Sequence, residues 1–308
     1  MARPSVAPGG ALPLPDTRPR WHAHDWNRAG VYRVGASVLG ALPRSARLTL
    51  AAALASVAPF PVERAVVRAN LARVAPGLRA VEREALVRRV FRCFAMCFAD
   101  LISSNRSEAE AGGLLAAVDG EAHIDAALAP GRGLILLTAH FGNWELAGRL
   151  VLRRFGRPTH VLVAAERDPR VEAFLRGAGP LRFVTSAHPV AGVTLLSALR
   201  RNEVVAMQGD RGLGTRGDLA VDFFGAPAAF PLGPFVLARA ARAPLVPVFC
   251  VLRDDHRYAI TVGAPIRVAP AGEGAALAAW VRVLEAQVSL HPEQWFNFFD
   301  VWSGAPAR

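Results

Sequence analysis

One histidine and one glutamate stand close together in the run TAHFGNWE at positions 138–145. An imidazole that is neutral near pH 7 can take a proton from a hydroxyl group, and a carboxylate beside it can fix its tautomer and stabilise the cation that forms. His140 and Glu145 are therefore a candidate catalytic pair. The alternative is structural: His140 caps a helix and Glu145 pairs with an arginine.

The residues around this pair predict a strand followed by a helix. The run GLILL at 133–137 is apolar and begins with glycine, as a buried parallel strand would, and a helical pattern starts at Glu145. Residues five apart on one helix point about 140° away from each other, so the pair requires His140 to lie in the turn before the helix. Such a turn sits at the carboxyl end of a strand, where open α/β sheets bind their ligands.

The longer segment 118–146, which ends in LTAHFGNWEL, closely resembles the bacterial lipid A biosynthesis acyltransferase family, the lauroyl/myristoyl acyltransferases. The motif of that family is H-x4-D/E inside H-x-G-N-W-E, and the similarity runs from about residue 26 to 302. The resemblance implies that His140 is the base and Glu145 its orienting partner. It also makes Gly142 and Asn143, within the same motif, candidate substrate-binding residues.

Charged residues follow two more predicted strands. Asp210 and Arg211 come after an apolar strand that begins at residue 204, and Arg167 comes after the strand 159–164. Two strand ends can face one cleft. The resemblance places Asp210 at the second acidic position of the family, which glutamine often follows and where Arg211 stands here. Because arginine can hold a phosphate or stabilise an oxyanion, Arg167 and Arg211 are candidate substrate-binding residues. Asp210 is a third candidate, because it follows a strand end in the same way. A surface ion pair with Asp168 or Glu166 is the alternative for Arg167.

The pattern along the chain predicts three regions. Residues 1–20, rich in proline, alanine and glycine, are expected to form a flexible tail, residues 21–110 a helical region, and residues 111–308 an α/β core integrated with it. Strands alternate with helices in the core, which indicates helices layered on a sheet, and the resemblance implies a central mixed sheet of the acyltransferase type. The predicted strands are 134–138, 159–164, 182–185, 204–208, 220–224, 245–252 and 257–262.

The helical region is predicted to associate with a membrane. Residues 32–42 and 48–60 read as short amphipathic helices, with arginines between them and two tryptophans before them. The longest apolar run without charge there, 48–62, has 15 residues and two prolines. A spanning helix needs about 20 residues, so we expect these helices to lie on the bilayer. An ordinary packed helical subdomain is the alternative.

Composition limits the partners. The chain is 52% hydrophobic and 20% charged, which is typical of a globular protein, and its net charge of +11 comes with 36 basic residues that are all arginine. Arginine suits phosphate groups, so the predicted partners are an anionic membrane surface, a membrane lipid acceptor, and acyl-carrier protein or a CoA thioester. Nucleic acid is not expected, because no binding motif for it is present.

Neither a metal nor a resident cofactor is predicted. The three cysteines have no CxxC spacing, and His22 and His24 lack a third and fourth ligand nearby. Unpaired cysteines suit a reducing compartment, which favours the cytoplasmic face of the bacterial inner membrane as the location. The acyl thioester would then be a co-substrate.

The predicted function is acyl transfer from acyl-ACP or acyl-CoA to a hydroxyl or amine of a lipid or glycolipid. The sequence has no G-x-S-x-G elbow, so we expect direct attack on the thioester. Two alternatives remain: thioester hydrolysis by the same pair, and a non-catalytic lipid-binding membrane adaptor. The C-terminal run HPEQWFNFFDVW at 291–302 departs from the basic sequence usual in the family, which resembles a divergent branch and leaves the acceptor open.

Overall fold

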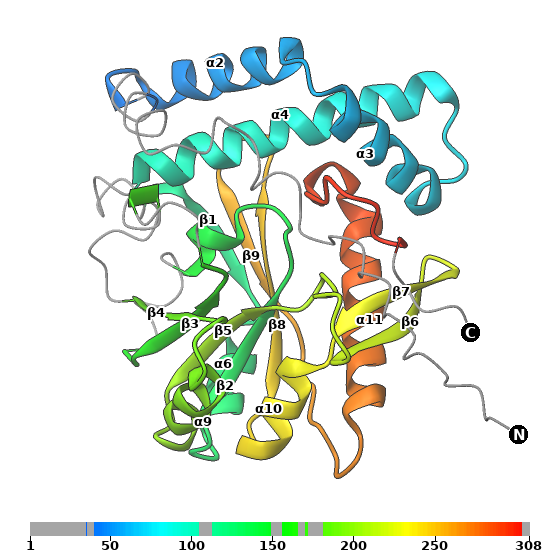
Figure 1. Cartoon of the computed structure of the whole chain (residues 1–308). Coiled ribbons are helices and arrows are strands. Elements are labelled where there is room, and N and C mark those ends of the chain that lie inside the picture. The colour runs from blue at the N-terminus through cyan, green and yellow to red at the C-terminus, as the bar shows by residue number, and fades with distance from the viewer. Residues whose placement is uncertain are drawn as a thin grey trace, which may run out of the picture.

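The centre of the protein is a seven-stranded sheet in the order β1-β9-β8-β2-β5-β3-β4 (Figure 1). The computed structural model describes residues 35, 40–104, 113–148, 156–165, 170–171 and 181–303. The strands of this sheet are β1 (Leu115–Asp119), β2 (Leu134–Thr138), β3 (Thr159–Val163), β4 (Leu181–Thr185), β5 (Val204–Gln208), β8 (Leu245–Leu252) and β9 (Tyr258–Val262). β8 and β9 are antiparallel and every other neighbouring pair is parallel, so the prediction of a mixed central sheet is confirmed.

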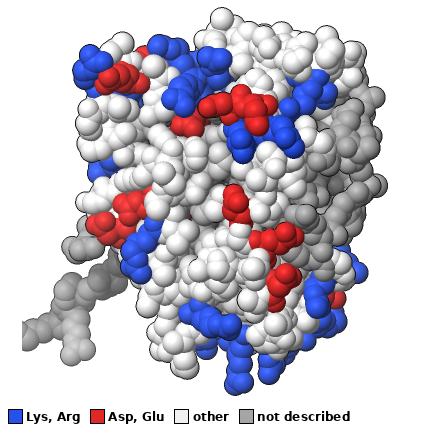
Figure 2. Space-filling model, turned by 180° about the vertical axis from the view of Figure 1, so that it is seen from behind, with Lys and Arg blue, Asp and Glu red and all other residues white. Residues whose placement is uncertain are grey.

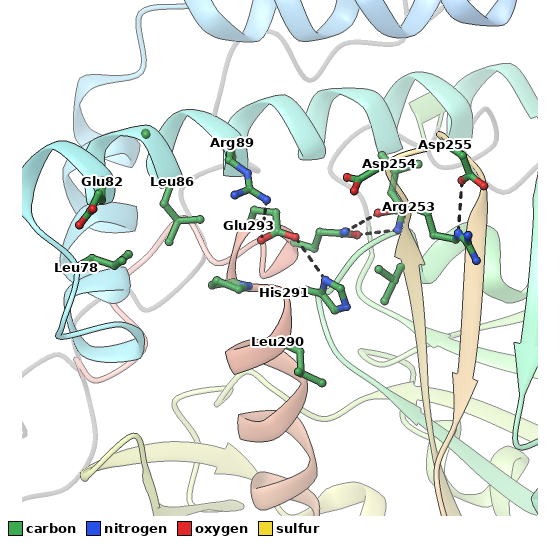
Figure 3. A pocket seen from close by; sticks show the side chains of 15 residues that line it. Leu78, Glu82, Leu86, Arg89, Arg253, Asp254, Asp255, Leu290, His291 and Glu293 are labelled. Carbon is green, nitrogen blue, oxygen red and sulfur yellow. Dashed lines mark hydrogen bonds and ion pairs between the residues drawn. The ribbon is translucent and has the colours of Figure 1, made fainter.

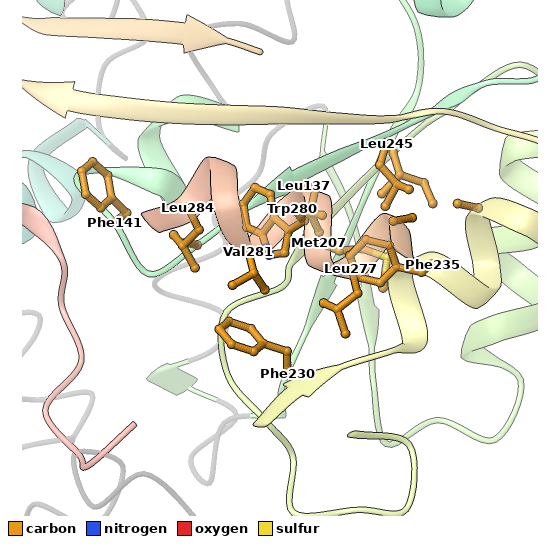
Figure 4. Close-up of a cluster of buried hydrophobic side chains, with 14 of the residues drawn as sticks. Leu137, Phe141, Met207, Phe230, Phe235, Leu245, Leu277, Trp280, Val281 and Leu284 are labelled. Atoms are coloured by element: carbon orange, nitrogen blue, oxygen red, sulfur yellow. The ribbon is translucent and has the colours of Figure 1, made fainter. Parts of the chain in front are cut away.

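Helices cover both faces of this sheet, and alternate residues of β2 show the two sides. Ile135 and Leu137 belong to a cluster with α9 (Ala191–Arg200), α10 (Gly233–Ala241) and α11 (Glu273–Leu290) (Figure 4). Leu134 and Leu136 belong to a second cluster with α6 (Ala122–Leu128) and the N-terminal helices. Because both faces are buried, the inner strands read as continuous apolar runs, which is why the sequence revealed them.

Two strands of the structure were not predicted from the sequence, and one predicted strand lies outside the central sheet. The predicted strand 220–224 corresponds to β6 (Asp218–Phe223), which pairs with β7 (Ala226–Pro231) in a separate two-stranded hairpin. β7 has the sequence APAAFP, and two prolines in six residues read as a loop. β1, with the sequence LAAVD, is short and only partly buried. Both strands exist because a neighbouring strand pairs with them, and neither carries a strong local pattern.

The described part of residues 21–110 is mainly helical. It consists of α2 (Arg44–Val57), α3 (Pro61–Val74) and α4 (Ala80–Ser104). The predicted helix 48–60 corresponds to α2, which begins at Arg44 and ends at Val57 because two prolines follow, the second of which is the first residue of α3. Most of the predicted helix 32–42 and the whole predicted tail 1–20 lie outside the described residues.

Within the described residues, no single helix is long and apolar enough to cross a membrane. α2 and α3 together meet the length and hydropathy requirement, but they are bent by 95° relative to each other. In Figure 1, α2 and α4 run side by side along the top of the molecule and α3 turns down beside the start of α4.

Candidate active site

His140 and Asp210 meet at the carboxyl ends of the neighbouring strands β2 and β5. The parallel register pairs Thr138 with Gln208, and the Gly209 amide extends the pairing with a 2.9 Å hydrogen bond to the Thr138 oxygen. Each charged residue follows its paired residue by two positions, so the register brings the two side chains together. The two strand ends are therefore neighbours, which the sequence allowed without requiring it.

Two hydrogen bonds connect the pair. His140 Nδ1 lies 2.8 Å from Asp210 Oδ1, and the backbone amide of His140 donates to Asp210 Oδ2 over 3.0 Å. The Asp210 side chain is fully buried, whereas 15% of the His140 side chain is exposed. The carboxylate therefore holds one edge of the imidazole from inside the protein.

The ionisation of Asp210 fixes the tautomer of His140. Burial raises the pKa of the Asp210 carboxyl, but the charge of His140 and its hydrogen bonds outweigh burial and bring this pKa to about 2. An ionised carboxylate can only accept hydrogen bonds, so the proton of a neutral imidazole must sit on Nδ1. We infer that Nε2 carries the basic lone pair of the neutral ring, which is the tautomer a general base needs.

Glu145 lies on the helix that follows His140. His140 precedes this helix, whose described residues are 144–148, so the geometric condition for the predicted pair is met. Glu145 is exposed, and the carboxylate that contacts Nδ1 of His140 is that of Asp210. The role of Glu145 as orienting partner stays a prediction.

Gly142 and Asn143 form the turn between His140 and the helix. Gly142 is buried with φ of +55°, and a Cβ there would lie 1.9 Å from the Cys250 oxygen. Only glycine fits this close approach to β8. Asn143 is also buried, and its side chain bonds protein groups, including the amide of Leu146. These contacts hold the loop; a direct contact of either residue with substrate stays a prediction.

The C-terminal segment closes the site on a third side. The Asn297 side-chain amide donates to Asp210 Oδ2 over 3.4 Å, and the Phe296 amide donates to the His140 oxygen over 2.9 Å. Arg211 binds this segment through Asn297 Oδ1 and the Phe296 oxygen, both at 2.8 Å. Burial lowers the pKa of Arg211 to about 10, with the charge of Asp210 opposing, so the guanidinium stays charged near pH 7.

Asn70 on α3 anchors the same segment. Its amide nitrogen donates to the backbone oxygens of Asn297 and Phe299 at 3.1 and 2.9 Å. In the sequence, Asn297 stands out as the one polar residue in the run WFNFF at 295–299, whereas Asn70 lies between two arginines and carries no such signal. Asn297 was not among the predicted site residues, and Arg167 lies outside the described residues.

A cavity of about 960 Å³ lies apart from His140 (Figure 3). α4, the end of β8 and the end of α11 with the 3-10 turn η2 (Pro292–Gln294) supply its walls, and Arg89, His291 and Glu293 point into it. Gln294 is a wall residue whose backbone oxygen accepts a 2.8 Å hydrogen bond from the Gly142 amide. The cavity therefore backs onto the turn after His140 and contains none of the predicted site residues.

The charge of the molecule is distributed unevenly. Seen from behind, arginines are interspersed with acidic side chains over much of the surface, and a further group gathers at the lower end (Figure 2). Among the described residues, no group of three or more histidine, cysteine, aspartate or glutamate side chains could hold a metal ion. The basic excess on this face does not form one continuous field.

Several known proteins are similar in sequence to part of this chain. A phosphatidylinositol mannoside acyltransferase of Mycobacterium tuberculosis (strain CDC 1551 / Oshkosh) is 32% identical over 192 residues, which cover 60% of this chain and 59% of that protein. The Mycolicibacterium smegmatis enzyme of the same name is 27% identical over 184 residues, 58% and 60% of the two chains. The lipid A biosynthesis lauroyltransferase of Escherichia coli (strain K12) is 29% identical over 200 residues, 62% and 64%.

The matched part spans less than two thirds of each of these relatives. The family model for bacterial lipid A biosynthesis acyltransferases, in contrast, matches residues 22–303, nearly the whole chain. The chain therefore belongs to the bacterial lipid A biosynthesis acyltransferase family.

Proposed function

We propose that this protein is a membrane-associated acyltransferase that moves a fatty acyl chain from a thioester to a hydroxyl or amine of a lipid acceptor. The observation that carries the proposal is the 2.8 Å contact between His140 and Asp210, which places the basic lone pair of the neutral imidazole on Nε2. Family membership supports acyl transfer as the chemistry on which such a base would act. Acyl-carrier protein or CoA would carry the donor chain.

In the reaction, one proton moves from the acceptor to His140 and then from His140 to the leaving thiolate. Nε2 of His140 takes the proton of the acceptor hydroxyl while its oxygen attacks the thioester carbonyl carbon, and Asp210 stabilises the imidazolium. The tetrahedral intermediate collapses, the carbon–sulfur bond breaks, and the imidazolium returns its proton to the leaving thiolate. The ester forms without an acyl-enzyme. An oriented base contributes roughly 10²–10⁴-fold, so positioning and oxyanion stabilisation must supply the rest.

Three predicted residues take supporting roles in this proposal. Glu145 is exposed near the start of the helix that follows the base, and we assign its carboxylate to orienting the acceptor or assisting His140. Arg211 holds the C-terminal segment against the site, and its charge lies next to Asp210. We assign Arg167 to donor phosphate binding on the basis of the family resemblance alone.

A glycosylated lipid is the acceptor class we favour. The relatives are named for phosphatidylinositol mannoside acylation and for a lauroyl transfer in lipid A biosynthesis. Both names point to an acceptor with sugar hydroxyls, which a histidine base can activate. The particular acceptor and the chain length depend on the shape of the substrate cavity.

We further propose that α2 and α3 dock the enzyme on the cytoplasmic face of the inner membrane. Four apolar side chains are exposed there: Leu50 by 37%, Leu54 by 58%, Val57 by 78% and Val62 by 51%. The first three recur at helical spacing on one side of α2, next to the side that carries its buried residues. We call these four side chains the apolar docking surface. Full burial of one such side chain contributes roughly 1.5–3 kcal/mol, so four of them support peripheral binding.

The test is acyl transfer by the full chain and by His140→Ala, with acyl-ACP or acyl-CoA as donor and glycolipid-containing vesicles as acceptor. Released thiol and acylated lipid are measured together. We expect His140→Ala to reduce transfer about 10³-fold, as for loss of a general base. His123→Ala is the matched control, because His123 lies at the start of α6, after a strand that runs antiparallel to β2 and so ends at the opposite edge of the sheet.

Three outcomes would contradict the proposal. Thiol release without lipid acylation would indicate a hydrolase. Lipid binding that is unaffected in His140→Ala, without any transfer by wild type, would indicate an adaptor. Near-normal transfer by folded His140→Ala would remove His140 as the base.

A further inference from the structure

Asn143, three residues after the proposed base, is a buried polar residue whose side chain points away from His140 into the protein. It is 3% exposed. Its amide nitrogen donates to the Cys97 oxygen and to the Tyr258 hydroxyl, both at 3.0 Å, and its Oδ1 accepts from the Leu146 amide over 3.3 Å. The backbone amide of Asn143 donates to the Cys250 oxygen over 2.9 Å. Asn143 thus fixes the loop to α4, β8 and β9 at once.

The Tyr258 hydroxyl continues this contact toward the surface. It donates to Asp100 Oδ2 over 2.8 Å. Asp100 in turn accepts from Arg44 Nε at 3.0 Å and Nη2 at 2.7 Å. Arg44 is the first residue of α2 and also donates to the His256 oxygen. Four side chains from four segments therefore form one chain from α2 to the catalytic loop.

Burial makes the direction of each bond definite. Burial raises the pKa of Tyr258 well above its usual range, so the group is a phenol with a single proton. Asp100 is 2% exposed and can only accept if ionised, so the phenol proton must point at it and the phenol oxygen must accept from Asn143. The amide of Asn143 is then fixed with its nitrogen toward Tyr258. Loss of any member leaves a buried polar partner unsatisfied.

α2 packs mainly against α4. Its buried apolar residues Leu48 and Ala51 form a small separate cluster with Ala99 of α4, outside the two large cores. An element with few buried apolar contacts opens at low free energy cost. The Arg44–Asp100 pair, with Arg44 27% exposed, adds a charged attachment between the start of α2 and α4.

We propose that Arg44, Asp100 and Tyr258 are positioning residues that hold the catalytic loop through Asn143, so that the seating of α2 controls turnover. This rests on the proposed role of His140 as base. The apolar docking surface lies on α2, and a membrane that holds α2 against α4 also stabilises the loop that bears His140. Misplacement of a reacting group by about 1 Å can reduce the rate about 10²-fold, so modest loosening of the loop is enough.

The first test compares steady-state kinetics of Tyr258→Phe and Arg44→Met with wild type on acceptor vesicles. Tyr258→Phe removes one oxygen and leaves Asn143 bonded to the Cys97 oxygen, so the fold survives. We expect kcat to fall about 10- to 100-fold while KM for the donor stays within twofold. The double variant should resemble the worse single variant, because the two side chains act as one unit.

Arg68→Met is the matched control. Arg68 of α3 pairs with Glu84 of α4 at 2.9 and 2.7 Å, the same kind of interhelical contact, but it does not lead to the loop. Its kcat should stay within twofold of wild type.

Hydrogen exchange of residues 141–148 gives a readout that does not depend on activity. The amides of Asn143, Leu146 and Ala147 are bonded within the loop or to β8 and should exchange at least tenfold faster in Tyr258→Phe, with residues 204–208 of β5 unchanged. Wild-type kcat and unchanged exchange in Tyr258→Phe would overturn the positioning proposal. If wild type itself transfers no acyl chain, the proposed function fails, and the exchange measurement still decides whether Tyr258 holds the loop.

Discussion

Replacing Asp210 by asparagine should reverse the tautomer of His140. Asp210 Oδ2 accepts from two donors, the His140 amide at 3.0 Å and the Asn297 side chain at 3.4 Å. In Asp210→Asn the oxygen of the amide will keep this position, because an NH2 group there would face both donors. The NH2 group then faces Nδ1 of His140 and donates to it. Nδ1 becomes an acceptor, Nε2 carries the proton, and the base is lost.

The expected fall in kcat of Asp210→Asn follows from the contacts that oppose the active tautomer of His140. The active tautomer requires the introduced side-chain amide to rotate so that its oxygen faces Nδ1 of His140. This rotation leaves two donors facing an NH2 group, which costs about 1–3 kcal/mol for each unsatisfied group, or roughly 2–6 kcal/mol in all. The carboxylate also loses its preference for the imidazolium: a pKa near 2 in place of 3.8 corresponds to about 2 kcal/mol. Together these terms predict a fall in kcat of about 10³-fold or more. Loss of a carboxylate behind a histidine base lowers kcat by about 10⁴ in the serine protease triad.

The assay is the initial rate of thiol release with lipid product confirmed by mass spectrometry, for Asp210→Asn and Glu145→Gln under saturating donor. Because the volume at residue 210 is unchanged, circular dichroism and thermal unfolding should show a folded protein. We expect Asp210→Asn to be the slower of the two. A folded Asp210→Asn enzyme within tenfold of wild type, or a much larger loss in Glu145→Gln, would refute Asp210 as the residue that fixes the tautomer.

Three further predictions concern stability and membrane binding. The pKa of Asp210 is lowered from 3.8 to about 2 in the folded protein. The ionised carboxylate therefore stabilises the folded state above about pH 4, and this stabilisation is lost as the pH falls toward 2. Chemical denaturation across this range should show a fall in the free energy of unfolding that Asp210→Asn lacks. Gly142→Ala should lower the free energy of unfolding by about 2 kcal/mol or more and abolish transfer, whereas Gly131→Ala, also at positive φ but with open space around it, should cost about 1 kcal/mol without loss of activity. Leu54→Glu should weaken sedimentation with anionic vesicles about tenfold or more, and Val193→Glu, equally exposed on α9, should not; equal binding by both would contradict the docking surface.

Much of the fold was readable because it rests on local pattern. Inner strands buried on both faces gave apolar runs, and the helices of the N-terminal region gave amphipathic ones. β1 and β7 were not predicted, because their pairing partners, rather than their own residues, stabilise them as strands. The break between α2 and α3 came at prolines that the sequence displayed, but the 95° bend followed from how α3 packs.

The site divides in the same way. The sequence determined that His140 and Asp210 each follow a buried strand, because an apolar run bounded by polar residues marks a strand end. Only the tertiary structure decided that β2 and β5 are neighbours, which places two residues 70 positions apart in direct contact. The same holds for Asn297 and Tyr258, which reach the site or its loop from distant segments. Strand order and the packing of segments depend on the free energy of the whole fold, and no local spacing encodes them.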